Sequence, residues 1–143
     1  MPHTGLEEAL SQAEGVILFD GHCGFCRNVV GMLLRQCPER RLLVCSTRSD
    51  RGATAARAVG GEPADTFAFV TTTTVDVGVD AYLRILRLGS RTRWLSRVVA
   101  AVPRRASDSV YQWVAQHRRL LSSVLGRGHV HAIPNDRFVP GGA

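Results

Sequence analysis

The sequence contains no lysine, so each of its 18 basic residues is an arginine, and aromatic residues make up only 6% of the chain. It has no apolar run of the roughly 18 residues that a membrane-spanning helix needs, and residues 1–14 lack the basic start and apolar stretch of a secretory signal. At 143 residues the chain is long enough to fold without a metal or a disulfide, as one domain. We therefore expect a cytoplasmic protein without a membrane span, whose thiols stay reduced.

The charge is divided unevenly along the chain. Residues 1–80 contain seven arginines and ten acidic residues, whereas residues 81–143 contain eleven arginines and two aspartates. The basic half is either a surface for an anionic partner or a solvated helical surface in an arginine-rich sequence. No nucleic-acid-binding motif accompanies the charge, so we do not expect nucleic acid as the partner.

Apolar patterns predict alternating strands and helices, followed by helices alone. Continuous apolar runs predict buried strands, and apolar residues three and four apart predict helices. The expected strands are 16–19, 41–47, 66–72 and 74–78, and the expected helices are 25 to Pro38, 51–59 closed by Gly60-Gly61, 81–88 capped by Asp80, and two stripes over 94–102 and 110–124. Trp94 and Trp113 lie on these stripes, where we expect them in the core.

This order predicts an α/β fold with a mixed four-stranded sheet flanked by helices. A helical crossover makes the first two strands a parallel pair, and the short connection makes the last two a hairpin. It is the order of the thioredoxin fold with a helical C-terminal extension. We expect residues 1–14 as a loosely tied leader, one domain over 15–125 with C-terminal helices from about 91, and an irregular tail over 126–143.

A C-x-x-C motif, Cys23 and Cys26, follows the first buried strand and opens the first long helix. The first N–H groups of a helix lack internal partners and carry the positive end of its dipole, so a thiol there ionises readily. Such cysteines have pKa values of about 3.5–7.5. The motif predicts a dithiol site in which Cys23 attacks and Cys26 resolves, while Gly24 leaves the site open and Phe25 offers an apolar contact.

A zinc site is the rival interpretation of these cysteines. Zinc sites usually need a second C-x-x-C pair or a His pair at wider spacing than His129-Val130-His131, and neither is present. We therefore expect no metal and no cofactor other than a Cys23–Cys26 disulfide. Of the remaining two cysteines, Cys45 is expected in the core, and Cys37 as a surface thiol at a helix end.

The segment VILFDGHCGFC, from Val16 to Cys26, resembles the DCC family of thiol-disulfide oxidoreductases, named for an Asp and two Cys spaced like Asp20, Cys23 and Cys26. A second stretch, from Asp108 to Arg118, is similar to the D-x-x-Y-x-x-[VI]-A-x-x-R helix of that family. Residues 80–86 look like its S-x-A-x-L-R-I-L stretch in a looser form, so the resemblance runs from about Val16 to Arg127. Family members often have an aromatic residue soon after that arginine, whereas this chain reads Arg-Arg-Leu at 118–120.

The resemblance implies a thioredoxin-like fold and disulfide exchange with a protein or small-molecule thiol, without identifying the substrate or the reductant. Thioredoxin-like proteins also keep a cis-proline facing the dithiol. The candidate here is Pro63, a little early in the chain. The family motif further points to Asp108, Tyr111 and Arg118, which either contact substrate or anchor their helix to the sheet. Asp108 is expected in the first turn of that helix, and Tyr111 and Arg118, seven residues apart, on one face.

Asp20 and His22 have two interpretations each. Asp20 either accepts a proton from the resolving thiol, as a carboxylate with a raised pKa near a buried site, or caps the turn. His22 either stabilises the Cys23 thiolate or is an exposed loop residue. The sequence thus predicts a protein-disulfide oxidoreductase that cycles through a mixed disulfide. The alternatives are a redox-sensitive binding module with a basic helical surface and a small zinc-binding domain.

Overall fold

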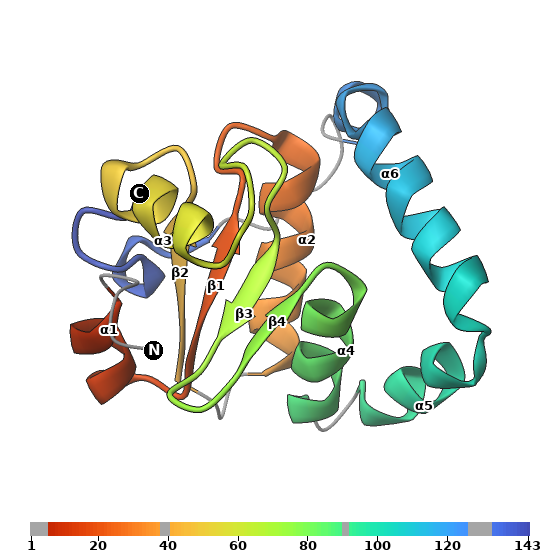
Figure 1. The fold of residues 1–143 in the computed structure, drawn as a ribbon, viewed down its shortest axis with the longest axis horizontal. Helices are drawn as coiled ribbons and strands as arrows, with labels where there is room; N and C mark the ends of the chain where they lie inside the picture. The colour runs from red at the N-terminus through yellow and green to blue at the C-terminus, as the bar shows by residue number, and fades with distance from the viewer. Residues whose placement is uncertain (1–5, 38–40, 90–91, 126–132) are drawn as a thin grey trace.

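The computed structural model describes residues 6–37, 41–89, 92–125 and 133–143 (Figure 1). The predicted end of the first long helix at Pro38 therefore lies outside the described residues. Along the chain the elements are α1 (Glu7–Gln12), β1 (Gly15–Phe19), α2 (Gly24–Gln36), β2 (Leu42–Ser46), α3 (Asp50–Ala58), β3 (Ala68–Val70), β4 (Val75–Val77), α4 (Val79–Leu88), α5 (Arg93–Ala101), α6 (Arg104–Leu125) and a short 3-10 helix (Asn135–Arg137).

The four strands form one mixed sheet in the order β2-β1-β3-β4. Strand β1 pairs with β2 in parallel, with Phe19 opposite Ser46, because helix α2 carries the chain back to the starting edge. Strand β3 runs antiparallel to both β1 and β4. The predicted α/β class and the mixed four-stranded sheet are confirmed, and the arrangement is that of a thioredoxin-like fold.

Helices cover both faces of this sheet (Figure 1). Side chains alternate along β1, so Ile17 and Phe19 face α2 and α4, while Val16 and Leu18 face α1 and α3. All four are fully buried, which explains why the strand is continuously apolar in sequence. The two cores fix the position of the carboxyl end of β1, where the C-x-x-C motif begins.

Described residues near both ends of the chain pack onto the sheet domain. Residues 6–14 of the predicted leader are not loosely tied as expected, because Leu6, Ala9 and Leu10 are buried in the core beneath α1. The predicted irregular tail falls partly outside the described residues, but residues 133–143 lie along β2. There Val139 N–H donates to Val44 O at 2.9 Å, and the chain forms a parallel bridge between Val44 and Phe138. The sequence did not predict this burial, because both terminal segments are too short for their apolar residues to show a helical or strand period.

Helices α5 and α6, which we call the helical arm, extend away from the sheet domain (Figure 1). The expectation that Trp94 and Trp113 lie in the core is wrong, since their exposed fractions are 64% and 55%. An amphipathic stripe shows which residues of a helix share a face, but not whether another element covers that face. Here α5 packs mainly on α4, and α6 touches α2 and α4, which leaves much of the stripe uncovered.

Two helix starts differ from the prediction. Helix α4 is preceded by Gly78 at φ 64°, a conformation that favours glycine, and Asp80 lies inside the first turn rather than at the cap. Helix α6 begins at Arg104, directly after Pro103, so Asp108 lies in its second turn. Both aspartates bind Arg104 instead, Asp80 at 2.8 Å and Asp108 at 3.4 Å. The pair with Asp80 connects the start of α6 to α4, whereas the pair with Asp108 lies within α6.

Among the helices of the described part of the chain, none is long and apolar enough to cross a bilayer.

Candidate dithiol site

The dithiol lies where the carboxyl end of β1 turns into α2. Cys23 is the N-cap residue of α2, and its Sγ accepts a hydrogen bond from Cys26 N–H at 3.3 Å. Cys23 N–H in turn donates to Asp20 O at 3.2 Å, which closes the turn. A thiol at this position takes the place of the Ser, Thr or Asp that usually caps a helix. The N-terminal amides of α2 therefore favour the thiolate form of Cys23.

The hydrogen bond donated by the Cys26 thiol is the largest cause that lowers the pKa of Cys23, and the pKa falls to about 6. Burial opposes this shift, while the Cys26 N–H and the charge of Arg118 support it. The pKa of Cys26 is raised strongly, because its thiol donates to Cys23, because it is more buried, and because a Cys23 thiolate repels a second negative charge. At neutral pH the pair therefore consists of one thiolate and one thiol.

Gly21 brings the turn against the end of β2. A Cβ atom at this residue would lie 2.3 Å from Ser46 Oγ and 2.8 Å from Ser46 Cβ. Such distances are far below van der Waals contact, so only glycine fits without movement of the neighbouring strand. The backbone carbonyl of Gly21 also accepts a hydrogen bond from Arg27 Nη1 at 3.0 Å, across the first turn of α2.

Asp20 is buried beside the dithiol and forms an ion pair with Arg48. The Arg48 guanidinium donates to both carboxylate oxygens, at 3.0 and 3.2 Å, and His22 N–H donates to Oδ1 at 3.0 Å. Burial raises the pKa of Asp20, but the hydrogen bonds from Arg48 and His22 and the charges of Arg48 and Arg118 outweigh it, and the pKa is lowered overall. The expectation of a raised pKa is therefore wrong. Burial alone suggested it, whereas the counterions come from residues distant in sequence.

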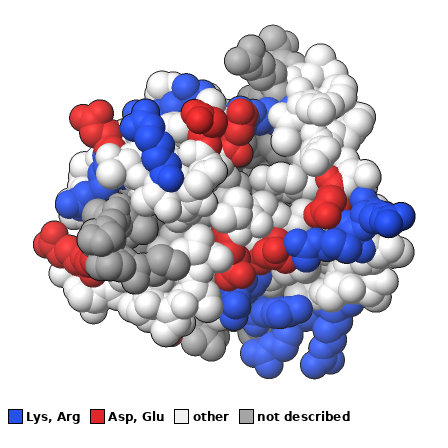
Figure 2. All heavy atoms as spheres, viewed as in Figure 1, with Lys and Arg blue, Asp and Glu red and all other residues white. Residues whose placement is uncertain are grey.

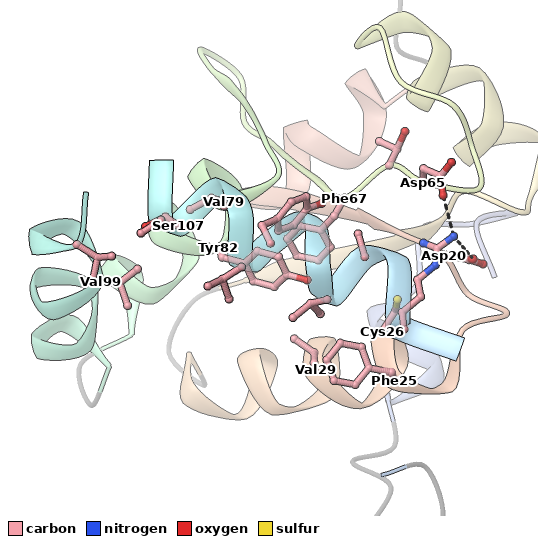
Figure 3. Close-up of a pocket in the computed structure, with 18 residues that line it drawn as sticks. Asp20, Phe25, Cys26, Val29, Asp65, Phe67, Val79, Tyr82, Val99 and Ser107 are labelled. Carbon is pink, nitrogen blue, oxygen red and sulfur yellow. Dashed lines mark hydrogen bonds and ion pairs between the residues drawn. The ribbon is translucent and has the colours of Figure 1, made fainter. Parts of the chain in front are cut away.

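Arg118 connects the helical arm to the dithiol. Its guanidinium donates to Ala64 O at 2.5 Å and to Asp65 Oδ1 at 2.9 Å, and it lies 3.9 Å from Asp20 Oδ2. In Figure 3 Asp65 and Asp20 lie close together at this point, next to Cys26. The positive charge lowers the pKa of both cysteines. Arg118 is thus a residue of α6 that acts on thiols almost a hundred positions earlier in the chain.

A cleft of about 430 Å³ extends from the dithiol between the sheet domain and the helical arm. Cys26, Phe25 and Val29 of α2 line it on one side, and Tyr82 of α4 lies across from them (Figure 3). Its lining on the arm consists of Val99 of α5, Val102 directly after that helix, and Ala106, Ser107, Val110, Tyr111, Val114, Ala115 and Arg118 of α6. We call this space the arm cleft. Apart from its end at Asp20, Asp65 and Arg118, its walls are mostly apolar.

The predicted site residues are only partly brought together. Phe25, Tyr111 and Arg118 line the arm cleft, and the last two lie on one face of α6 as expected. His22 is exposed on the turn, and Gly24 is the first residue of α2. Asp108 lies apart from the dithiol, half exposed and paired with Arg104, since the helix begins earlier than predicted.

Pro63 is not a cis-proline, because every peptide bond of the described residues is trans. It lies in the loop before β3, where its carbonyl accepts a hydrogen bond from Thr47 Oγ1. The following residues, Ala64 and Asp65, bind Arg118. The loop that contains Pro63 therefore borders the site through Arg118.

The other two cysteines are both buried. Cys45 is in the core between the sheet and α3, as expected, and burial raises the pKa of its thiol. Cys37 is only 3% exposed, which contradicts the expected surface thiol. Its Sγ lies 3.7 Å from Ile85 O, since the end of α2 packs against α4. Among the residues with described positions, no group of three or more His, Cys, Asp or Glu could hold a metal, and His129 and His131 lie outside them.

Sequence reasoning missed Gly21, Arg48 and Asp65. A signal existed for Arg48, which comes two residues after β2, as Asp20 comes one residue after β1. Because β1 and β2 are parallel with Phe19 opposite Ser46, residues beyond their carboxyl ends meet at one edge of the sheet. Asp65 carried no such signal, since its role comes from the ion pair with Arg118, which depends on how α6 packs against the loop before β3.

A thioredoxin-like sheet with a C-x-x-C dithiol at the start of its first long helix defines a protein of the thiol–disulfide exchange class. The family model described as DCC1-like thiol-disulfide oxidoreductase matches residues 17–124, and the chain belongs to this family. The resemblance found in the sequence is thereby confirmed.

Among curated proteins, the chain is similar to one from Bacillus subtilis (strain 168) that bears the name "Uncharacterized protein YuxK". The two are 28% identical over 106 residues, which cover 72% of this chain and 77% of that protein. No solved structure matches the chain at a significant level.

Proposed function

We propose that the protein is a protein-disulfide oxidoreductase in which Cys23 is the attacking thiol and Cys26 the resolving thiol. The observation that carries this proposal is the position of Cys23 as the N-cap of α2, partly exposed, with its Sγ bonded to Cys26 N–H. With a pKa of about 6, Cys23 is mostly thiolate at neutral pH. A thiolate with a pKa near the ambient pH combines ionisation with nucleophilicity.

The reaction proceeds in two exchanges. The Cys23 thiolate attacks one sulfur of a substrate disulfide, forms a mixed disulfide and releases the other sulfur as a thiolate. Cys26 then loses its proton and attacks Cys23 Sγ, which releases the second substrate thiol and leaves a Cys23–Cys26 disulfide. Two electrons pass to the substrate, and a thiol reductant must return them to the Cys23–Cys26 pair. The pair itself is the electron carrier in this proposal, without a further cofactor.

The electrostatic coupling of the two thiols sets the order of these steps. While Cys23 is a thiolate, its charge and its hydrogen bond hold the proton on Cys26. Once Cys23 is part of a mixed disulfide, it carries no charge, so the hydrogen bond and the repulsion that raise the Cys26 pKa disappear and only the effect of burial remains. Cys26 therefore becomes easier to ionise only after the substrate is attached.

Asp20 acts in this scheme as a positioning residue. Its carboxylate binds Arg48 and the His22 N–H, which fixes the turn before Cys23. A lowered pKa makes it a weak base for the Cys26 proton. In Asp20→Asn, exchange with a small disulfide should stay within about twofold of the parent rate over pH 6–9, because loss of a negative charge does not hinder ionisation of either thiol. A deficit near pH 7 that shrinks as the pH rises would show that Asp20 accepts the proton.

Mixed-disulfide trapping tests the roles of the two cysteines. Cys26→Ser lacks the resolving thiol, so it should accumulate covalent adducts with disulfide substrates, detected by mass spectrometry of the intact protein. Cys23→Ser is the matched control and should form none, since the remaining Cys26 thiol is the more buried of the two and burial still raises its pKa. Adducts in Cys23→Ser, or faster alkylation of Cys26 than of Cys23 across pH 5–9, would reverse the assignment.

We place this reaction in the cytoplasm, where thiols are kept reduced.

A further inference from the structure

The shape and size of the arm cleft are those of a binding site. Figure 3 shows it as an elongated space, with Cys26 and Asp20 at one end and Val99 and Ser107 at the other. Its volume of about 430 Å³ falls within the range of small-molecule sites and also suits several side chains of a bound segment. Apolar groups that enter it would leave water, which is the main source of binding free energy at such a surface.

Aromatic rings form the floor of the cleft. Phe67 stacks on Tyr82 with 4.0 Å between ring centroids, and Tyr111 meets Tyr82 edge to face at 6.2 Å. Burial raises the pKa of Tyr82, so its hydroxyl stays protonated. The floor therefore presents a rigid apolar surface with phenol hydroxyls that can donate to a backbone carbonyl.

The apolar surface continues past the cleft onto the exposed side of the arm. Val102 and Val110 line the cleft and are nevertheless 43% and 62% exposed. Trp94, Val98 and Trp113 are more than half exposed on the same two helices. A molecule that only fills 430 Å³ would leave these side chains in water, whereas a polypeptide segment could cover them.

The charge beside this surface indicates the polarity of the partner. Arg93, Arg97 and Arg105 are exposed on the arm, and Arg105 directly precedes Ala106, which lines the cleft. In Figure 2 arginines gather along the edge formed by α4 and α5. An acidic partner would be attracted to this edge, and the attraction would weaken with salt.

We propose that the arm cleft is the recognition site for protein substrates, and that it binds an apolar segment with acidic flanks next to the target disulfide. The inference rests on the proposed function and adds the substrate class. Cys26 lines the inner end of the cleft, and Cys23 Sγ contacts its amide and thiol. A substrate sulfur bonded to Cys23 therefore lies next to the inner end of the cleft, with only the Cys26 side chain between Cys23 and the bound segment.

Three model peptides test this proposal on the full chain. Each carries one cysteine joined to 2-nitro-5-thiobenzoate, so attack by Cys23 releases a coloured thiolate that reports the second-order rate constant. The first peptide has apolar residues and aspartates beside its cysteine. The second has serines in place of the apolar residues, and the third has lysines in place of the aspartates. The leaving group is common to all, so the ratios of rate constants report only the flanks.

We expect the first peptide to react about tenfold faster than the second, since burial of one or two apolar side chains supplies that factor. It should also react faster than the third, by a ratio that falls with added salt. Ala106→Phe and Ala115→Phe place a ring in the cleft from exposed positions of α6, and each should bring the first ratio close to one. Ala100→Phe, exposed on α5 and outside the cleft lining, is the matched control and should keep the parent ratio.

Several results would overturn the proposal. A parent ratio near one, or a high ratio unchanged by both Ala106→Phe and Ala115→Phe, would place recognition elsewhere. If the peptides are not distinguished but diphenyl disulfide reacts in an Ala106→Phe-sensitive way, the occupant is a small apolar molecule. A reduced parent protein that sediments as a dimer, and as a monomer after Ala106→Phe, would identify a second copy as the occupant. Reaction of Cys23 with 5,5′-dithiobis(2-nitrobenzoate) tests the proposed function separately, because a Cys23 that does not react with this reagent would overturn the proposed function whatever the peptide ratios are.

Discussion

The dithiol edge of the sheet and the helical arm lie next to each other but are built differently. At the edge, Asp20 and Gly21 are buried, and each is held by hydrogen bonds or by close contact with β2. On the arm, α6 is largely exposed along its described length, and its apolar residues are only partly covered. The reacting sulfur is thus fixed on a rigid support, while the surface proposed for recognition belongs to a less packed element.

Arg118 is where the two regions meet. Its bonds to Ala64 and Asp65 hold α6 over the loop before β3, and its charge acts on the thiols. A change in the position of the arm would therefore change the ionisation of Cys23. The following variants test whether the dithiol edge is rigid, whether the exposed arm contributes little to stability, and whether Arg118 couples the two.

Among the variants of the dithiol edge and the arm, the largest effect is expected for Gly21→Ala. The new methyl group would overlap Ser46, and overpacking of this kind costs about 3 kcal/mol of the free energy of unfolding at the upper end of the usual range. Urea denaturation followed by circular dichroism measures the loss. In the double variant Gly21→Ala/Ser46→Gly the obstructing side chain is absent, so part of the stability should return. Equal stability of parent and Gly21→Ala would mean that the turn adapts, against the rigidity argued here.

Asp20→Asn should have the next largest effect on stability, about 1–2 kcal/mol, because it removes a charged partner of Arg48 while the amide still caps the turn. The folded-state pKa of Asp20 is lowered, so the stabilisation is present above the unfolded pKa of about 4 and is lost as the pH falls through the folded pKa. The difference between the urea midpoints of parent and variant should be the same at every pH from 7 to 5, and it should shrink in more acidic solution. A gap that widens below pH 4 would contradict the sign of the shift.

Arg118→Met should raise the pKa of Cys23, since it removes a positive charge that lowers it. At pH 5.5 the rate constant for alkylation of Cys23 by iodoacetamide should fall roughly twofold to fivefold. Arg104→Met, on the same helix but paired with Asp80 and Asp108, is the control and should leave this rate unchanged. An equal change in both variants would mean that displacement of the arm, and not the charge, is responsible.

The smallest effect is expected for Trp94→Gln on the arm. Its side chain is 64% exposed, so the free energy of unfolding should change by no more than about 0.5 kcal/mol. Ile85→Ala in α4, which is fully buried, should cost about 2–5 kcal/mol in the same urea experiment. A large loss in Trp94→Gln would show that the arm contributes to the core after all.

The sheet domain was largely predictable from the sequence because its signals are local. Three signals located the dithiol correctly: the apolar run of β1, the helical spacing of α2 and the C-x-x-C motif between them. Each of these signals is contained in a short stretch of the sequence. The DCC resemblance rested on this segment and on two stretches further along the chain, residues 80–86 and 108–118, and is confirmed by the family match. Local hydrogen bonding and hydrophobic periodicity are encoded at the residues that form them.

The errors have a different origin. Trp94 and Trp113 were predicted to be buried but are exposed, and Cys37 was predicted to be exposed but is buried. The pKa of Asp20 was predicted to be raised but is lowered. In each case the local pattern was correct, but its environment comes from another element. The stripe of α5 is uncovered, the end of α2 meets α4, and Arg48 and Arg118 surround the carboxylate.

By itself the sequence therefore determined the order of strands and helices, the parallel pairing of β1 with β2, the β3–β4 hairpin and the position of Cys23 at a helix start, because these depend on neighbours along the chain. Only the tertiary structure decided which counterions surround Asp20, that an arginine of α6 acts on the thiols, and that a cleft separates the arm from the sheet domain. The physical reason is that Coulomb interactions and burial depend on distances in space between residues far apart in sequence, and no periodicity along one segment records them.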